Sequence, residues 1–295
     1  MPEAAEVAVA ATQLDAIARG RALLALPVTH DRTVRHTDPA AVAAFAGRTV
    51  AGVRSHGKWI VVDLDGTDDS LGIHLRMSGQ LLVAEPGTPH PDRHVHATLH
   101  LSHPGMSGRC QDPPDNGTRF SGGAQVEVWF RDPRTFGELR ALAGGRPPGA
   151  DDLFDASVTG ARLLEGASGR RAAVKAVLLD QQRTVAGVGS YLADESLHRA
   201  GIDPTVPACE LARSAWERIL VAARAIAVDS MAAGGVTLDD EGWVDLHGRP
   251  GTYASELQVH ARTTCATCGT PTSSAEVGGR RARWCRRCQH RRRRR

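Results

Sequence analysis

The stretch RTVAGVGSYLADESLHRAGIDP, residues 183–204, decides how the second half of the chain folds, because it joins two predicted helices through Gly187-Val188-Gly189. Helical spacing covers 172–182 before the glycines and 190–200 after them. Glycines let backbone amides approach a ligand closely, and the second helix begins with free N–H groups at its positive dipole end. This arrangement suits a phosphate, although a plain helix–turn–helix packing motif has the same spacing.

Outward from this stretch, the pattern changes at GGRPPGADD, 144–152, which is typical of a linker. After it we expect helices, including a long one over 207–231. Before it we expect a helix over 4–26 and a long hairpin loop over 102–123. Period-two alternation predicts strands that form a β-sandwich or barrel, at 49–53, 59–64, 72–75, 80–84, 97–101 and 125–130.

Four of the six cysteines form two close pairs, CATC at 265–268 and CRRC at 285–288. Two such pairs at the base of a hairpin can complete a tetrahedron around Zn²⁺, and four protein ligands leave no open position for catalysis. The sequence therefore predicts one structural zinc per chain, held by Cys265, Cys268, Cys285 and Cys288. A zinc ribbon that serves stability alone, or four buried free cysteines, remain possible from this segment.

Charge is distributed unevenly along the 295 residues. The formal net charge is only +3, yet 280–295 holds ten arginines and no acid, and such a segment attracts polyanions. We find no signal peptide and no run of about 18 apolar residues that could cross a membrane. We therefore expect a cytoplasmic, nucleoid-associated protein with no membrane partner.

The first residues, MPEAAEV, place Pro2 beside Glu3, with Glu6 one helical turn later. A secondary amine with a neighbouring carboxylate could act as an activated nucleophile. Many chains begin with Met-Pro for no catalytic reason, so these residues decide nothing by themselves.

Together these motifs make the chain resemble the formamidopyrimidine-DNA glycosylase / endonuclease VIII family of repair enzymes, over essentially its whole length. Any one of the motifs is modest, but their order matches the family. They are MPExxEV at the start, HxxMSG at 74–79, DPRTFG at 132–137, LLDQQ…GVGSYLADESLxxAGIDP, GGVTLDD with the later GRPGTY, and CxxC…CxxCQ.

The resemblance implies an α+β fold with two domains, in which a β-sandwich flanked by helices precedes a helical domain with a helix–two-turn–helix and a zinc-finger hairpin. The implied parts are a catalytic domain at 1–145, a linker at 146–155, a helix–two-turn–helix domain at 156–235, a lesion-recognition loop and connector at 236–264, the zinc finger at 265–289 and a basic tail at 290–295.

The resemblance also implies a reaction. After removal of Met1, the imino group of Pro2 would attack the sugar C1′, and Glu3 would transfer protons as general acid/base. Lys58, the third catalytic residue implied, would reach the DNA near the lesion and contact a phosphate or act as a general acid, and Glu6 would orient the terminus. The implied activity is a glycosylase for oxidised purines (8-oxoguanine, formamidopyrimidine) with AP lyase cleavage by β,δ-elimination.

The remaining implied residues contact DNA. Met77, Arg134 and Phe136 would fill the space left by an everted base. Gly187, Gly189, Ser190 and Arg280 would hold phosphates. The implied partner is damaged double-stranded DNA, bound by a monomer.

Four features depart from the family pattern, the first being a loop at 102–123 that is longer than usual. Ala4-Ala5 replaces Leu-Pro, Ser190 replaces an asparagine, and VHARTTC replaces the YGR approach to the finger. GSYL resembles the endonuclease VIII branch, which favours oxidised pyrimidines as substrates. Two further functions stay open, namely a damaged-DNA-binding protein without catalysis and a zinc-ribbon adaptor for protein partners.

Overall fold

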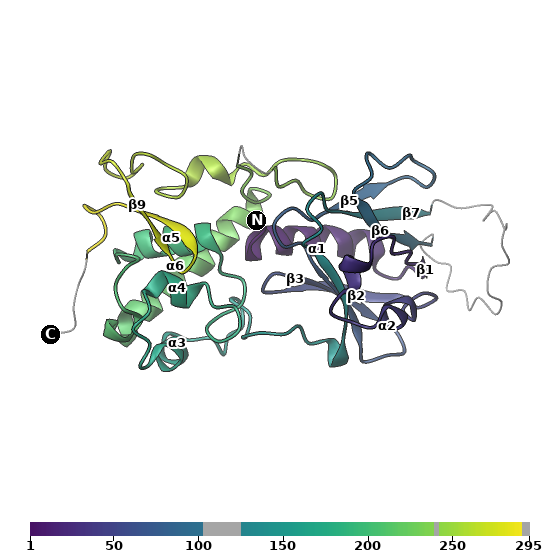
Figure 1. Ribbon diagram of the computed structural model, residues 1–295, viewed down its shortest axis with the longest axis horizontal. Coiled ribbons are helices and arrows are strands. Elements are labelled where there is room, and N and C mark those ends of the chain that lie inside the picture. The colour runs from purple at the N-terminus through teal and green to yellow at the C-terminus, as the bar shows by residue number, and fades with distance from the viewer. Residues whose placement is uncertain (103–124, 239–241, 291–295) are drawn as a thin grey trace. The chain divides into compact units, whose positions relative to one another are not determined.

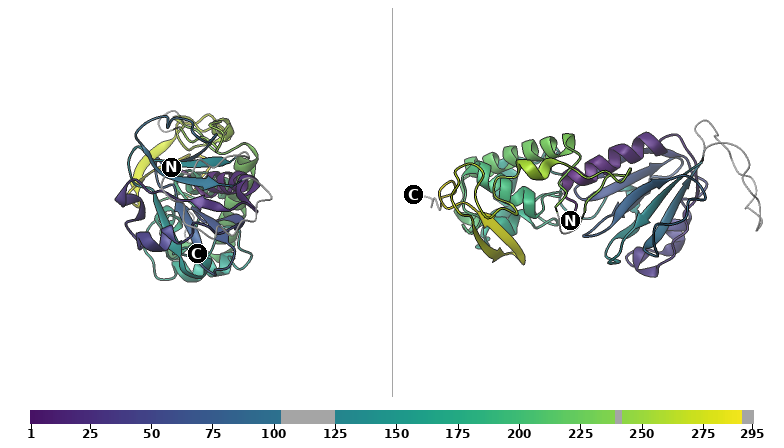
Figure 2. Two further views of the ribbon diagram at one scale, coloured as in Figure 1. Left: turned by 90° about the vertical axis from the view of Figure 1, so that its right-hand side faces the viewer. Right: turned by 90° about the horizontal axis from the view of Figure 1, so that it is seen from above.

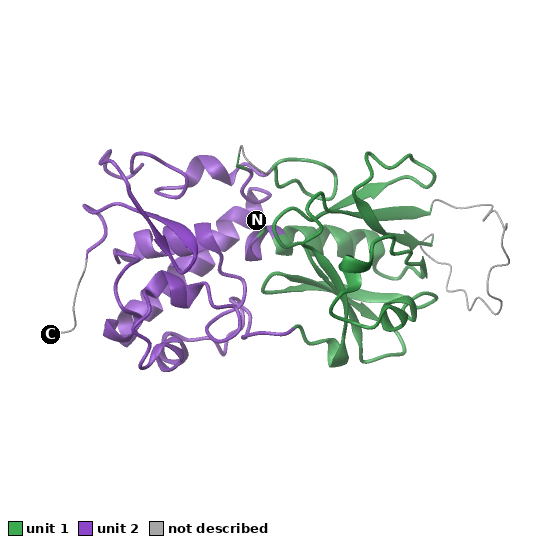
Figure 3. Ribbon diagram, in the orientation of Figure 1, with its two compact units in different colours: residues 1–2, 7–147, 238–250 green, residues 3–6, 148–237, 251–295 purple. Residues whose placement is uncertain are grey.

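The computed structural model describes residues 1–102, 125–238 and 242–290 (Figure 1). The chain divides into two compact units (Figure 3), and the division passes through the first helix. Unit 1 comprises 1–2, 7–147 and 238–250, and unit 2 comprises 3–6, 148–237 and 251–295. The loop expected over 102–123 lies almost wholly outside the described residues, as do 239–241 and 291–295.

Unit 1 contains two four-stranded antiparallel sheets. The first has the order β2-β3-β4-β8, formed by Val50–His56, Trp59–Leu64, Ser70–His74 and Glu138–Leu142. The second has the order β1-β6-β7-β5, formed by Leu23–Ala25, Val95–Leu101, Val126–Arg131 and Gln80–Ala84. Fully buried Ile60, Ile73, Leu99 and Phe130 from both sheets belong to one core. The expected sandwich is therefore confirmed.

Helix α1, Ala4–Ala18, adds its apolar face to the same core through Val7 and Leu14, and lies beside the strands in Figure 2. The helix expected over 4–26 was too long. Gly20 takes a left-handed φ of 75°, which ends the helix, and the chain then enters β1. Leu24, which we expected at a helical position, thus lies in a strand.

The expected strands agree with the structure better than the expected helices do. The bounds of β3 and β5 are those predicted, and the other four predicted strands differ by up to three residues at an end. Strand β8 was missed because Glu138 and Arg140 interrupt its apolar pattern.

Unit 2 is built from helices and one hairpin. Its elements are α3 (Gly160–Ala167), α4 (Val174–Leu178), α5 (Ser190–Ala200), α6 (Arg213–Ala232), β9 (Ser273–Val277) and β10 (Arg280–Trp284). Helix α5 has the predicted bounds. It ends at Gly201, whose left-handed φ of 72° forms the C-cap.

Two helices of unit 2 are shorter than expected. Helix α4 has only five of the residues predicted over 172–182. Helix α6 begins at Arg213 and not at 207, because a short 3-10 turn, Ala208–Glu210, is followed by Leu211 in an extended conformation. Apolar residues alone do not show where such a break falls.

Short elements connect the rest: η1 (Asp31–Val34), α2 (Pro39–Ala43), η2 (Ala143–Gly145) and η4 (Tyr253–Glu256). Among the described residues, no helix combines the length and the apolar character needed to cross a membrane.

Candidate active site and metal centre

Glu3 lies at the N-terminus of α5. Its carboxylate accepts N–H hydrogen bonds from Gly189 (2.7 Å), Tyr191 (2.9 Å) and Leu192 (3.2 Å), and its side chain is buried. A carboxylate is favoured there because it satisfies unpaired N–H groups at the positive end of the helix dipole. The N–H groups that we expected to be free for a phosphate are thus occupied by Glu3.

Gly189 is needed for this contact. A Cβ added to it would lie 2.2 Å from Cδ of Glu3, while its φ of −116° is accessible to any residue. The glycine therefore provides space for the acid and not a special backbone conformation. The Ala4 N–H, which donates to the Gly187 carbonyl at 3.1 Å, holds the start of α1 against the same turn.

Glu6 is buried beside Glu3. It accepts N–H hydrogen bonds from Glu3 and Val236, both at 2.8 Å, and the hydroxyl of Tyr191 donates to it at 3.2 Å. Burial and the charge of Glu3 raise the pKa of Glu6 above its usual value. Burial and the charge of Glu6 also raise the pKa of Tyr191, so its hydroxyl stays protonated and remains a donor.

Tyr191 is a functional candidate that the sequence analysis missed. Its hydroxyl also lies 3.3 Å from Oγ of Ser230 on α6. In the sequence, Tyr191 follows the apolar spacing of α5 and resembles an ordinary core residue. Its hydroxyl group, which needs a hydrogen-bond partner when buried, was the one signal that could have identified it.

Pro2 and Lys58 belong to unit 1. Pro2 is buried and covalently precedes Glu3. Lys58 is also buried, directly before β3. His74, at the end of β4, stacks edge-on against Trp59 of β3. Burial and the positive charges of Arg76 and Lys58 lower the pKa of His74 to about 3, so this imidazole is neutral.

Met77, Arg134 and Phe136, the residues predicted to fill the space left by an everted base and called the wedge residues below, occupy two turns of unit 1. Met77 follows β4, whereas Arg134 and Phe136 lie between β7 and β8. The Arg134 guanidinium lies 4.9 Å from the centre of the Phe136 ring, and Phe136 is 40% exposed. Phe136 is therefore not a core residue, although core packing is the commoner role of an aromatic residue beside a strand.

Glu138 is a buried acid beside these turns that the sequence analysis did not single out. His36 and Arg76 donate hydrogen bonds to it, and Arg140 lies 3.7 Å away. Burial opposes ionisation, but the hydrogen bonds from His36 and Arg76 and the charges of Arg76 and Arg140 lower the pKa of Glu138 overall. The side chain is thus a carboxylate at neutral pH.

Ser190 lies at the edge of a buried charge network in unit 2. The fully buried Nζ of Lys175 donates to Asp194 (2.7 Å), to the Arg281 carbonyl (2.7 Å) and to Oγ of Ser190 (3.2 Å). His260 contacts the other oxygen of Asp194 at 2.8 Å. The network thereby ties α4 and α5 to strand β10, which begins at the exposed Arg280.

The four paired cysteines come together. The ligand atoms of Cys265, Cys268, Cys285 and Cys288 all lie within 4.8 Å of one another, and three of the Sγ pairs are 3.5, 3.6 and 4.0 Å apart. A Zn–S bond of about 2.3 Å requires tetrahedral sulfur pairs about 3.8 Å apart, so the donor set and its size fit zinc. His198 Nε2 lies 3.5 Å from Sγ of Cys265.

The hairpin above this cluster rests on α4. A Cβ at Gly278, in the β9–β10 turn, would lie 2.8 Å from Cβ of Ala176, and Val277 and Trp284 pack against the same helix segment. The finger is therefore positioned by both its sulfur cluster and its contact with α4.

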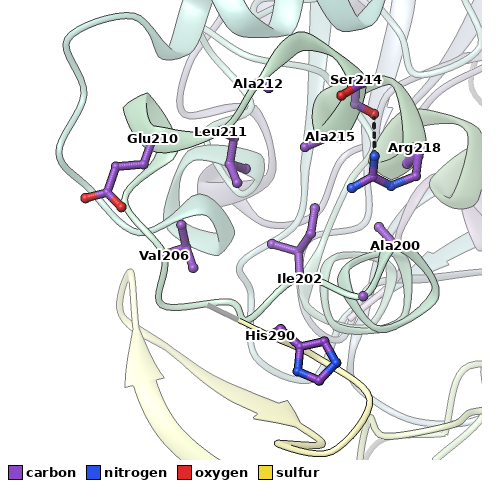
Figure 4. A pocket seen from close by; sticks show the side chains of 11 residues that line it. Ala200, Ile202, Val206, Glu210, Leu211, Ala212, Ser214, Ala215, Arg218 and His290 are labelled. Atoms are coloured by element: carbon purple, nitrogen blue, oxygen red, sulfur yellow. Dashed lines mark hydrogen bonds between the residues drawn. The ribbon is translucent and has the colours of Figure 1, made fainter. Parts of the chain in front are cut away.

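Unit 2 also contains a cavity of about 400 Å³ between the end of α5 and the start of α6 (Figure 4). Ile202, Leu211, Arg218 and His290 are among its lining residues, and none of the predicted site residues lines it.

Two family models match this chain. Residues 1–139 match the formamidopyrimidine-DNA glycosylase N-terminal domain, and residues 149–241 match the formamidopyrimidine-DNA glycosylase H2TH domain. A formamidopyrimidine-DNA glycosylase of Halorhodospira halophila is 38% identical, with 98% of this chain and 100% of the relative covered. One from Corynebacterium jeikeium is 34% identical with the same coverage.

Solved structures agree. The MutM (Fpg) protein from Thermus thermophilus is 28% identical, with a TM-score of 0.78 and 98% of each chain covered. Lactococcus lactis Fpg in complex with an abasic site containing DNA shares the fold, with a TM-score of 0.79, 22% identity and coverage of 98% and 99%. Since full-length relatives exceed 30% identity and both halves match, this chain belongs to the formamidopyrimidine-DNA glycosylase family.

Proposed function

We propose that this protein is a bifunctional DNA glycosylase and AP lyase that removes oxidised purines, such as 8-oxoguanine and formamidopyrimidines, from double-stranded DNA. One observation carries the proposal: the Glu3 side chain is buried against the N-terminus of α5, the helix that follows the Gly187-Val188-Gly189 turn. Glu3 directly follows Pro2 in the chain. That contact holds a carboxylate beside the proposed nucleophile.

In the proposed reaction, Met1 is removed and the Pro2 nitrogen attacks C1′ of the damaged nucleotide. The bond from C1′ to the base breaks, the base leaves with a proton, and the nitrogen loses its own proton. The C1′–O4′ bond then opens as the ring oxygen is protonated, and the resulting iminium ion serves as an electron sink. Loss of a proton from C2′ then expels the 3′ phosphate, and a second elimination expels the 5′ phosphate. An α-amino group has a pKa of roughly 8, so a usable fraction is neutral near pH 7.

Glu3 is the proposed general acid/base. Its three N–H hydrogen bonds fix the position of the carboxyl group that exchanges protons during the reaction. Glu6 orients the start of α1, and Lys58 contacts a phosphate near the lesion.

Recognition of the DNA is assigned to three further groups. Met77, Arg134 and Phe136 enter the duplex where the damaged base leaves it. Ser190 holds a phosphate through its N–H and hydroxyl groups, and Gly187 and Gly189 form the turn that presents it, because their own N–H groups are donated to Gln181 and Glu3. Arg280 binds another phosphate. Zinc bound by the four cysteines maintains the hairpin that carries Arg280, and the protein acts as a monomer.

Borohydride trapping tests the chemistry. With an abasic-site duplex, the processed protein should form a covalent protein–DNA adduct. Pro2→Gly should form this adduct more slowly, because a primary, less constrained amine, which can still form a Schiff base, replaces the imino group. Glu3→Gln should retain folding and DNA binding but slow excision. Mass spectrometry must establish that Met1 has been removed. Absence of an adduct with correctly processed protein would reject the lyase proposal in favour of a DNA-binding protein without catalysis.

A second substrate class has one specific feature in its favour. The segment Gly189-Ser190-Tyr191-Leu192 resembles the corresponding residues of the endonuclease VIII branch, which acts on oxidised pyrimidines. A panel of lesion duplexes decides between them: faster excision of 8-oxoguanine than of oxidised thymine supports the purine proposal, and the reverse order supports the pyrimidine one.

A further inference from the structure

Both predicted wedge turns contain a non-glycine residue in the left-handed backbone region. Arg76, with φ of 54°, immediately precedes Met77, and Thr135, with φ of 53°, immediately precedes Phe136. In the described residues only one other non-glycine residue, Ala261, has a positive φ. Such strain persists only where surrounding contacts determine it, and it gathers at binding and catalytic sites.

The first of these contacts is an ion pair between the two turns. The Arg76 guanidinium donates to Oε1 of Glu138 at 2.5 Å, and the Glu138 carboxylate is fully buried at the start of β8. Glu138 comes two residues after Phe136, so the pair joins the Met77 turn directly to the Phe136 turn.

The second contact is Asp132, which binds both turns. It accepts hydrogen bonds from the Ser78 hydroxyl (2.6 Å) and from the N–H groups of Gly137 (2.6 Å) and Arg134 (3.2 Å). Asp132 is fully buried, so these hydrogen bonds do not compete with water.

The third set of contacts comes from Arg35 and His36, the two residues that follow η1. Arg35 donates to the carbonyl oxygens of Phe136 (2.5 Å) and Gly137 (3.3 Å), and His36 contacts the second oxygen of Glu138. The backbone on both sides of Phe136 is therefore held by charged groups from outside its own turn.

We propose that Glu138 and Arg76 are positioning residues that hold Met77, Arg134 and Phe136 as one preformed wedge before DNA binds. This inference rests on the proposed function of those three side chains. A preformed wedge does not lose conformational freedom when it enters the duplex, so insertion is faster than for two independent turns. Glu138 and Arg76 need not touch the DNA to have this effect.

Insertion can be measured without catalysis. A duplex with an uncleavable tetrahydrofuran residue and an adjacent 2-aminopurine reports unstacking by stopped-flow fluorescence. Glu138→Gln keeps the size of the side chain but removes the charge that holds Arg76. We expect insertion about tenfold slower, as when a functional group is slightly misplaced. In a mismatched bubble, where unstacking costs little, we expect rates within about twofold of the wild type.

Two further variants make the result specific. Glu127→Gln is the matched control, since Glu127 lies in the same unit and pairs with His100 and Trp129 instead of the wedge turns. Arg76→Gly removes the guanidinium but allows a positive φ at no steric cost. It should show the same defect as Glu138→Gln, and the double variant should be no worse than either, because both changes break one interaction.

The inference is overturned if Glu138→Gln and Arg76→Gly both insert into the duplex at the wild-type rate, or lose as much rate in the bubble as in the duplex. Thermal unfolding shows which variants fold, and Arg76→Gly decides the matter if Glu138→Gln does not fold. If wild-type insertion shows this pattern while no lesion is excised, the proposed function fails but the wedge inference stands.

Discussion

The two acids that follow Pro2, Glu3 and Glu6, have different chemical environments. Glu3 caps a helix and accepts three N–H groups, whereas Glu6 is buried beside another acid. The raised pKa of Glu6 means that the folded protein holds this proton more tightly than the unfolded chain does. The contribution to stability is complete below the usual pKa of 4.5 and is lost as the pH rises through the raised value.

We therefore predict that Glu6→Gln flattens the pH dependence of stability above pH 4.5. A single carboxyl group contributes a slope of at most about 1.4 kcal/mol per pH unit, so the difference in unfolding free energy between wild type and variant should change by less than that per unit. Urea unfolding between pH 5 and 8 measures it. Glu165→Gln, at an exposed acid of α3, should leave the slope as it is, and an equal effect of both variants would contradict the prediction.

Tyr191 offers a subtler change at the same place. Tyr191→Phe removes only the hydroxyl that donates to Glu6, and the ring can remain in place. Loss of one hydrogen bond to the buried carboxyl group of Glu6 should destabilise the protein by about 1–3 kcal/mol. Thermal or urea unfolding tests this, and unchanged stability would mean that the hydroxyl is not a required donor for Glu6.

Among the elements, the turn before α5 depends on the size of one side chain. Gly189→Ala would place a methyl group 2.2 Å from Cδ of Glu3 and displace the carboxylate from the helix N-terminus. We predict a loss of stability of about 1–3 kcal/mol from overpacking, together with slower excision.

Gly166→Ala is the matched control in the same unit. Gly166 is an exposed residue of α3, and the nearest atom to an added Cβ is 3.5 Å away. Because alanine is the better helix former, this variant should gain about 0.5–1 kcal/mol. Urea unfolding should therefore show a lower free energy of unfolding for Gly189→Ala and a higher one for Gly166→Ala. A change in the same direction for both variants would show that the Glu3 contact is not what requires glycine.

The zinc hairpin is the second element with its own test. We predict one zinc per chain by elemental analysis, and a loss of bound zinc and of DNA affinity in Cys268→Ser, because a tetrahedral site with three thiolates holds the metal more weakly. The helices of unit 2 have cores without sulfur ligands, so far-UV circular dichroism should change little. Stoichiometric zinc in the Cys268→Ser variant would contradict this assignment.

For the whole molecule, charge predicts how DNA binding responds to salt. The chain has a net charge of +3, but ten arginines lie in 280–295. The logarithm of the DNA-binding constant should fall linearly with the logarithm of the salt concentration, with a slope of about −0.9 for each phosphate that the protein neutralises. Arg280→Ala should reduce the slope by about 1, whereas Arg93→Ala in unit 1 should not. A slope near zero for the wild type would instead favour an adaptor that binds proteins.

The sequence by itself determined the family, the sandwich strands, the bounds of α5 and the four-cysteine cluster. Each of these follows from a short-range pattern: strand alternation, a glycine at each end of α5, and two pairs of cysteines, each pair separated by two residues. Such patterns reflect interactions between neighbours along the chain, and the order of motifs then identifies the family.

Only the tertiary structure decided which polar groups meet. Glu3 caps a helix whose N-cap residue, Gly189, comes 186 residues later in the chain. Glu138 accepts a hydrogen bond from Arg76, which lies in a different connection between strands. Neither acid differs in sequence from an exposed one, and the helix N-terminus that local pattern left open for phosphate is filled by a distant carboxylate. Burial raises the energetic importance of such contacts, but their partners are set by the packing of remote segments, which no local pattern records.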